Sequence, residues 1–332
     1  MSRSELTAAL PCATNPPSER RAAAIGGAGP TCDRQKDGLA PIPSGILLSQ
    51  REPLRTLLAV LAHPDDESFG FGGTLALYAS GGTAVHLACA TRGEAGTVDP
   101  VHLGNHRSIG ELRESELRCA SERLGLRSVV FLGYRDSGMA GSAGNAHPEA
   151  FIRQPLNEVA GRIVRCIREL KPDVVVTFDP MGVYGHPDHI HVHQATVMAF
   201  ERAGDATFFP DVATPFAPRA LYFHVVSHQL LRIAVRIMPL IGMNPRKSGR
   251  NHNIDLKRMA EAAYPVHVRV SIQPARHMRD AARACHASQG GSRFGRDLLS
   301  RLRGFLGERD QFMRAYPMVS TNAKVSDDLF DV

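Results

Sequence analysis

The sequence contains no Trp and few other aromatic residues, with 14 Phe and 6 Tyr among its 332 residues. Single-stranded nucleic acids are usually bound where aromatic side chains stack on the bases beside a basic groove. The net charge is only +6, and the arginines are scattered along the chain rather than gathered in one block. We therefore expect no nucleic acid partner.

Long hydrophobic runs are also missing. A membrane-spanning helix needs about 20 consecutive apolar residues, and the longest candidate, residues 230–243, is interrupted by Arg232, Arg236 and Pro239. This stretch indicates a surface or core-facing helix. The apolar patch at residues 6–10 is too short for a secretory signal. We expect no membrane span and a cytoplasmic protein.

Cysteines are few and form no CxxC pair. Dense cysteine spacing is typical of small secreted domains, whereas dispersed cysteines are typical of reducing compartments. The sequence therefore predicts ordinary buried thiols rather than disulfides, which agrees with a cytoplasmic location. The six residues are Cys12, Cys32, Cys89, Cys119, Cys166 and Cys285.

The composition divides the chain into three regions. Residues 1–50 are rich in Pro, Ala, Gly, Ser and Arg without apolar periodicity, which predicts a disordered N-terminal extension. Residues 51–290 have the pattern of one catalytic α/β domain, and residues 291–332 indicate a basic C-terminal helical extension or lid. Overall hydrophobic content of 43% is enough for a full core.

From residue 55 onward, apolar strand patterns alternate with helical patterns. This alternation predicts a doubly wound, mainly parallel, Rossmann-like sheet with helices on both faces. The predicted strands are residues 55–61, 84–90, 128–132, 174–178, 220–226 and 266–270. The predicted helices are residues 72–79, 109–124, 156–170, 187–203 and 275–288, and residues 293–316 indicate two basic amphipathic helices or a lid.

A polar cluster follows the first predicted strand. His63, Asp65, Asp66 and Glu67 occupy four of five consecutive positions directly after the apolar residues 57–62. All four side chains can bind a metal or transfer a proton. A segment built only to fold would rarely place two carboxylates directly after a buried strand, so we interpret this stretch as half of a metal-hydrolase site. Asp66 or Ser68 could instead only cap the following helix.

A second polar cluster follows the fourth predicted strand and contains His186, Pro187, Asp188 and His189. Pro187 suits the first turn of a helix, so His186 and His189 can point the same way. In doubly wound sheets, ligands bind at the carboxyl ends of the strands, where the strand order reverses. If the order is 3-2-1-4-5, strands one and four are neighbours and the two clusters face each other there.

Together the clusters supply a ligand set for zinc. Catalytic zinc takes three protein ligands and a water, and it accepts His nitrogen and carboxylate oxygen. His63, Asp66 and His189 would form this set, and iron(II) could use the same ligands. Asp65 could then accept a proton from the attacking water, and His186 could stabilise the oxyanion or protonate the leaving amine.

Two further histidines lie on the same predicted helix. His193 follows His189 by one turn and could be the metal ligand in its place. His191 is better explained as a solvated or core residue.

The two clusters, His63-Pro64-Asp65-Asp66-Glu67 and residues 186–189, strongly resemble the signature motifs of the LmbE-like, or PIG-L type, zinc-dependent N-deacetylases. That family includes the deacetylases of mycothiol and bacillithiol synthesis and the GlcNAc-phosphatidylinositol de-N-acetylase. The resemblance covers roughly residues 55–290. It implies the same zinc ligands, general base and acid partner that the chemistry of the residues indicates.

The family likeness also extends to three other segments. It implies that Glu94, Arg113 and Asp136 contact an N-acetylglucosamine unit, and that Tyr184 helps to polarise the carbonyl group. Arg113 could instead form only a surface ion pair with a neighbouring glutamate on its helix. Residues 286–289 resemble a late family motif, although an arginine, residue 279, stands where many members have lysine.

The sequence thus favours a metal-dependent amide hydrolase that removes an N-acetyl group from a small-molecule sugar. An amidase acting on a larger acyl group or a thiol conjugate is the alternative within this class. A non-heme iron oxygenase and a metal-dependent nucleotide-sugar-binding protein are the alternatives outside it. The adjacent Asp65 favours hydrolysis over oxygenation, and no GxGxxG loop follows strand one. A homo-oligomer is compatible with the sequence.

Overall fold

The computed structural model describes residues 55–226, 228–248, 254–262, 264–291, 308–320 and 322–332. These residues belong to one compact unit. The predicted N-terminal extension, residues 1–50, lies outside the described residues.

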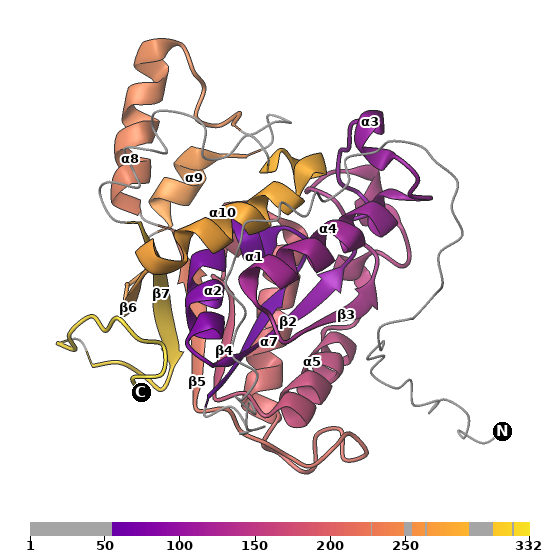
Figure 1. The fold of residues 1–332 in the computed structure, drawn as a ribbon, viewed down its shortest axis with the longest axis vertical. Coiled ribbons are helices and arrows are strands. Elements are labelled where there is room, and N and C mark those ends of the chain that lie inside the picture. Colours follow the sequence, from indigo (N-terminus) through magenta and orange to yellow (C-terminus); the bar gives the residue numbers. More distant parts are fainter. Residues whose placement is uncertain (1–54, 227, 249–253, 263, 292–307, 321) are drawn as a thin grey trace, which may run out of the picture. The chain divides into compact units, whose positions relative to one another are not determined.

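The centre of this unit is a seven-stranded sheet with the order β3-β2-β1-β4-β5-β7-β6 (Figure 1). The five strands from β3 to β5 are parallel, and β7 pairs antiparallel with β5 and β6. The order 3-2-1-4-5 is therefore confirmed, and it reverses between β1 and β4. The strands are β1 (Thr56–Leu61), β2 (Ala84–Thr91), β3 (Ser128–Tyr134), β4 (Val174–Phe178), β5 (Ala220–Val225), β6 (Val268–Ser271) and β7 (Arg309–Tyr316).

The central strands are buried on both faces. Every residue of β2 and β4 is buried, as are all residues of β1 except Thr56. A parallel sheet covered on both sides needs such near-continuous apolar strands. This requirement explains why the apolar runs in the sequence predicted these strands with little error.

Helices cover both faces of the sheet. Connections between parallel strands are right-handed. The helices α2 and α4, in the connections from β1 through β2 to β3, therefore lie on one face, and α5 and α7, in the connections from β3 through β4 to β5, lie on the opposite face. Accordingly α10 packs on α2 and α4, whereas α5 packs on α7. The helices are α1 (Asp66–Phe69), α2 (Gly72–Ser80), α3 (Pro100–Leu103), α4 (Ile109–Leu124), α5 (Leu156–Leu170), α6 (Gly182–Gly185), α7 (Pro187–Arg202), α8 (His228–Ile237), α9 (Leu256–Glu261) and α10 (Arg276–Cys285).

Short 3-10 helices connect several of these elements. They are η1 (Ala143–Ala146), η2 (Phe151–Arg153), η3 (Met238–Ile241), η4 (Gln273–Ala275) and η5 (Ala287–Gln289). The predicted ends of α4 and α5 agree with the structure. Gly125 closes α4 in the left-handed conformation that favours glycine (φ 73°).

The prediction of helices within residues 293–316 is wrong for its last part. Residues 309–316 form β7, which lies between β5 and β6 in the sheet. The side chains of β7 alternate only weakly between polar and apolar, and its basic residues obscured the strand pattern in the sequence. Phe312 is the one buried residue of this strand. Residues 292–307 lie outside the described residues.

The prediction that the cysteines are unpaired thiols is also wrong for two of them. Cys119 on α4 and Cys285 on α10 form a disulfide, a pairing that their separation in the sequence concealed. Cys89 and Cys166 are buried, as predicted. The inference of a reducing compartment thus loses part of its basis. Among the described residues, no helix has the length and apolarity to cross a membrane.

Candidate metal centre and active site

The turn between β1 and α1 has a strained backbone at Asp65. This residue precedes α1 with φ 117° and ψ −27°, a conformation that residues other than glycine rarely adopt. Such strain costs on the order of 1–3 kcal/mol and persists only where the surroundings impose it. The backbone N–H of Asp65 donates to Oε2 of Glu67 at 3.0 Å, which ties the turn to the buried Glu67 side chain.

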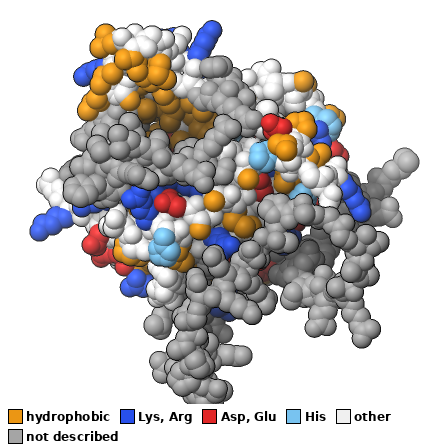
Figure 2. Space-filling model, turned by 45° about the horizontal axis from the view of Figure 1, so that its top comes forward, with side chains coloured by type: hydrophobic (Ala, Val, Ile, Leu, Met, Phe, Trp, Pro, Cys, Tyr) orange, Lys and Arg blue, Asp and Glu red, His pale blue; other side chains and the backbone are white. Residues whose placement is uncertain are grey.

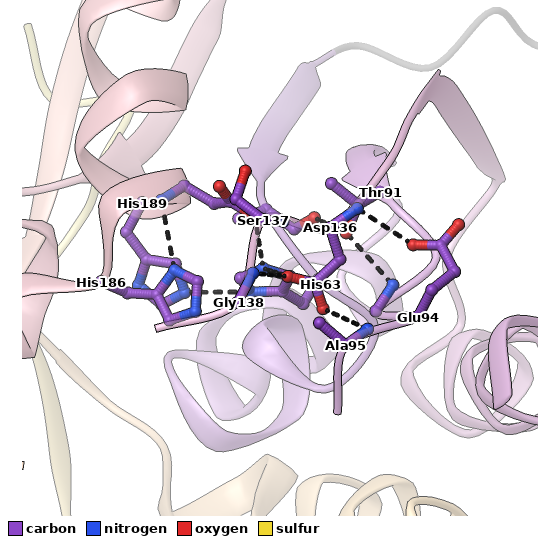
Figure 3. Close-up of polar contacts among 12 residues, drawn as sticks. His63, Thr91, Glu94, Ala95, Asp136, Ser137, Gly138, His186 and His189 are labelled. Carbon is purple, nitrogen blue, oxygen red and sulfur yellow. Dashed lines mark hydrogen bonds and ion pairs between the residues drawn. The ribbon is translucent and has the colours of Figure 1, made fainter. Parts of the chain in front are cut away.

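Three predicted ligands meet at this turn. His63 Nδ1 lies 3.2 Å from His189 Nε2 and 3.5 Å from Asp66 Oδ2, and His189 Nε2 lies 3.3 Å from Asp66 Oδ1. Figure 3 shows the side chain of His63 facing those of His186 and His189. The structure therefore brings together the two clusters that the sequence placed at neighbouring strand ends.

These separations suit a metal ion. A tetrahedral zinc with bonds of about 2.0–2.1 Å holds its ligand atoms about 3.3 Å apart. Burial would raise the pKa of Asp66, but His189 and His63 outweigh it and hold that pKa well below its usual value. The result is an ionised carboxylate beside two imidazole nitrogens, which is a donor set that fits zinc or iron(II).

Other sets of ligand atoms also lie within 4.8 Å of one another: His63 with His186 and His189, and His63 with Asp136 and Asp188. The second set lies on the Nε2 side of His63, where its carboxylates already accept backbone N–H groups from Ser137 and Gly138. The set of His63, Asp66 and His189 stays a prediction, supported by contacts of 3.2–3.5 Å that run from the two histidines to different oxygens of Asp66 and from one histidine to the other.

Asp188 makes a contact in the site that was not expected from the sequence. Its Oδ2 atom lies 3.2 Å from His63 Nε2, and the side chain is fully buried. A carboxylate on the far nitrogen of a metal-binding histidine fixes the tautomer and the ring orientation. Asp136 Oδ1 lies 3.5 Å from the same nitrogen. The position of Asp188 inside the second cluster was a signal for such a role.

His186 and Tyr184 lie beside the ligands. The ring centroid of His186 is 4.6 Å from that of His63 and 5.0 Å from that of His189, so the two histidines of the second cluster do point the same way. The backbone N–H of Asp188 donates to His186 Nδ1, which leaves the proton of a neutral ring on Nε2. Burial, followed by the charges of His63 and His189, lowers the pKa of His186. Tyr184 stands 5.1 Å from the His189 ring.

The two remaining histidines of α7 point elsewhere. His193 Nδ1 lies 2.8 Å from the carbonyl oxygen of Phe178, and its ring packs against Phe223. The ring of His191 packs edge-on against Phe151. Neither histidine belongs to a group of ligand atoms among the described residues. This placement favours His189 over His193 as the ligand.

Arg113 on α4 donates hydrogen bonds to the turn that contains Asp65. Its guanidinium donates to Asp65 Oδ2 at 3.0 Å and also to the carbonyl oxygens of Pro64 and Gly93. The alternative of a surface ion pair is wrong, because Arg113 is buried and its ion pair is with Asp65. Burial raises the pKa of Asp65 to about 6, although Arg113 opposes this shift.

The loops predicted to contact substrate are tied to one another. Glu94 Oε2 accepts the backbone N–H of Asp136, and Asp136 Oδ2 accepts that of Ala95 (Figure 3). Gly93 has φ 68°, and a Cβ atom there would lie 2.0 Å from Nη1 of Arg113. The glycine is therefore needed for the close approach of the guanidinium. Contact of Glu94, Arg113 and Asp136 with a substrate stays a prediction.

Residues 58–200 match the family described as PIG-L, GlcNAc-PI de-N-acetylase. A Streptomyces avermitilis protein is 45% identical over 183 residues, covering 52% of this chain and 62% of the relative. A Geodermatophilus obscurus protein is 36% identical over 248 residues, covering 71% of this chain and 83% of the relative. Both are named 1D-myo-inositol 2-acetamido-2-deoxy-alpha-D-glucopyranoside deacetylase.

Solved structures share the fold at lower identity. GalB, the 4-carboxy-2-hydroxymuconate hydratase from Pseudomonas putida, superimposes with a TM-score of 0.51 at 19% identity, covering 82% of this chain and all of that chain. Dbv21, the A40926 pseudoaglycone deacetylase, gives 0.50 at 17% identity with 81% and 100% coverage. One of these two proteins is named as a hydratase and the other as a deacetylase, so the shared fold alone does not decide the reaction. Sequence identity over most of the Geodermatophilus relative does decide the family: this chain belongs to the LmbE-like, PIG-L family of GlcNAc-PI de-N-acetylases.

Proposed function

We propose that the protein is a metal-dependent hydrolase that removes the N-acetyl group from a sugar of the N-acetylglucosamine type. One observation carries this proposal: His63 Nδ1, His189 Nε2 and the carboxylate oxygens of Asp66 are in contact at 3.2–3.5 Å, and Asp65 is the residue next to Asp66 in the chain. The names of the relatives point to 1D-myo-inositol 2-acetamido-2-deoxy-alpha-D-glucopyranoside as the first substrate to test.

His63, Asp66 and His189 would hold the metal, and zinc is the metal that this donor set fits best, with iron(II) as the alternative. A zinc ion at such a site polarises a carbonyl group and lowers the pKa of water. The rest of the chemistry belongs to the side chains around it.

Asp65 is the proposed general base. Its carboxylate is fixed by Arg113, and a pKa of about 6 allows it to accept a proton from the attacking water near neutral pH. His186 carries its proton on Nε2 and can donate a hydrogen bond to the oxyanion of the tetrahedral intermediate. The proton that Asp65 took from the water can then pass to the leaving amine, so that amine and acetate are released. Tyr184 is the proposed second donor to the oxyanion.

An amidase acting on a larger acyl group is the second candidate within the same chemistry, because the metal ligands do not determine the length of the acyl group. A non-heme oxygenase would need open metal positions and no adjacent base, so the fixed Asp65 carboxylate favours hydrolysis. We also carry forward the cytoplasmic location and the homo-oligomer as predictions.

The test is acetate release from the inositol glycoside and from a panel of other N-acetylated glycosides, with metal content measured on the same purified sample. We expect stoichiometric metal, activity that a chelator abolishes, and acetate as the acid product. Release of a longer acid from amide conjugates without acetate would point to the amidase. Metal binding with oxygen consumption in the presence of 2-oxoglutarate, and no acid from any amide, would overturn the proposal.

A further inference from the structure

The segment that follows β5 presents an unusual number of large apolar side chains to solvent. It consists of α8 and η3 with the residues up to 248, and we call it the α8 hairpin. Figure 2, which brings the top of Figure 1 forward, shows hydrophobic side chains gathered at its upper left, where Figure 1 places α8. The exposed fractions are 53% for Ile233, 48% for Ile237, 83% for Leu240, 66% for Ile241 and 52% for Met243.

These side chains share one face. Ile233 and Ile237 are four residues apart on α8, and Leu240 and Ile241 continue the stripe at the next helical spacing in η3. Isolated surface apolar residues are common, but a contiguous group of this size marks an interaction surface.

The charged residues of the α8 hairpin itself have a single sign. Between Asp211 and Asp255 the sequence contains no acidic residue. Within the hairpin, Arg232 and Arg236 border the stripe along α8, and Arg246 follows the tip; all three are exposed. The neighbouring helix α9 carries the nearest acidic residues in the sequence, Asp255 at its start and Glu261 at its end, and the Asp255 carboxylate accepts the N–H of Arg258.

We propose that the α8 hairpin docks the protein on an anionic membrane surface. An apolar stripe flanked by Arg and Lys, with low overall hydrophobicity, is the pattern of a helix that lies in the lipid interface. The helix has ten residues and is about 15 Å long, so it can lie in the interface but cannot span the bilayer.

Charge also distinguishes a membrane from other partners. In a symmetric dimer the same patch would face itself, which would bring Arg236 and Arg246 near their own copies across the contact. A nucleic acid would meet an apolar tip without any aromatic residue on which bases could stack. An anionic leaflet offers both a medium for the apolar side chains and a partner for the arginines.

The location of the hairpin gives the docking a consequence for the active site. The helix α8 begins just beyond the carboxyl end of β5, on the same edge of the sheet as the metal centre. It packs on α9, where Arg232 Nε donates to the carbonyl oxygen of Ala260, and α9 packs on α6, which carries Tyr184. A docked hairpin therefore holds the active site close to the lipid surface.

The test is co-sedimentation of the full chain with vesicles. We expect binding to vesicles of phosphatidylcholine mixed with phosphatidylglycerol, weaker binding to pure phosphatidylcholine, and loss of affinity as salt screens the arginines. The double variant Leu240→Ser with Ile241→Ser should bind at least ~10-fold more weakly, because two large apolar side chains no longer enter the lipid. Arg236→Gln with Arg246→Gln should lose roughly 20-fold on the anionic vesicles only.

Val101→Ser is the matched control, since Val101 is 77% exposed but lies on α3. It should bind vesicles like the parent protein, and all variants should retain the parent melting temperature and hydrolytic activity in the absence of lipid. Equal binding by the Leu240→Ser, Ile241→Ser variant and the parent would overturn the proposal. The proposal would also be overturned if the parent bound neither kind of vesicle and instead formed a dimer without lipid that the Leu240→Ser, Ile241→Ser substitutions dissociated. The dependence of the parent on lipid charge tests the proposal even if a variant fails to fold.

Discussion

His286 Nε2 lies 2.7 Å from Glu67 Oε1, and both side chains are fully buried although 219 residues separate them in the sequence. The other oxygen of Glu67 accepts the N–H of Asp65. The end of α10 therefore reaches the strained turn through one carboxylate. A second link runs in parallel, because Arg283 Nε donates to the carbonyl oxygen of Ser68.

The first prediction concerns this pair. His286→Ala should lower kcat by about 10-fold or more while metal content and KM stay near the parent values, because a base displaced by a fraction of an ångström loses much of its effect. His286→Gln should recover most of the loss, since its amide can still donate to Glu67. Activity and metal assays on the two variants provide the measurement. If kcat stays unchanged and only the melting temperature falls, the pair is structural and does not position Asp65.

The second prediction separates base from ligand at two adjacent residues. Asp65→Asn should keep its metal but turn over at least ~100-fold more slowly, because the amide cannot accept the proton. It retains an oxygen for the hydrogen bond from Arg113, so the turn should persist. Asp66→Asn is the matched variant and should lose metal. Metal loss from the Asp65 variant would make that residue a ligand and reverse the assignment.

The third prediction tests the choice between two histidines on α7. His189→Ala should lose bound metal, measured by elemental analysis after dialysis, because its Nε2 lies within 3.5 Å of both other ligands. His193→Ala should keep the metal and lose only stability, since its contacts are with Phe178 and Phe223. If His193→Ala lost the metal and His189→Ala kept it, the ligand would be His193 and not His189.

The parallel half of the fold was predictable because each strand had to be apolar throughout and each helix had one apolar face. The same physical rule failed for β7, a strand beside the edge of the sheet with half-exposed polar side chains. For the site, the positions of the two clusters at strand ends predicted that they would meet. The contacts of Arg113 with Asp65 and of His286 with Glu67 were not predictable, because each depends on a tertiary distance that no spacing along the chain encodes.

The fourth prediction concerns the disulfide between Cys119 and Cys285, which joins α4 to α10. A bond that closes so long a loop reduces the freedom of the unfolded chain and typically adds about 2–4 kcal/mol to stability. The double variant Cys119→Ser, Cys285→Ser should therefore unfold at a lower denaturant concentration than the parent. Reductant should lower the stability of the parent but not of the variant. A parent protein whose six thiols all react with an alkylating reagent after unfolding without reductant would show that the bond does not form.

The fifth prediction concerns acid stability. His224 is buried between Phe71 and Phe312, and burial lowers its pKa from 6.5 to about 4. The unfolded chain binds a proton here near pH 6.5, whereas the folded chain does not until about pH 4. The unfolded state therefore holds more protons within this window, and stability must fall as the pH drops through it.

His224→Phe removes that linkage and keeps a ring between the two phenylalanines. Its melting temperature should consequently fall less steeply than that of the parent between pH 6.5 and 4, with the two curves running parallel above pH 7. His86 also has a pKa lowered to about 4 by burial, so a residual slope should remain in the variant. His277→Phe is the matched control because His277 is exposed. This variant should keep the slope of the parent. Identical slopes for the parent and the His224 variant would show that His224 does not contribute to acid unfolding.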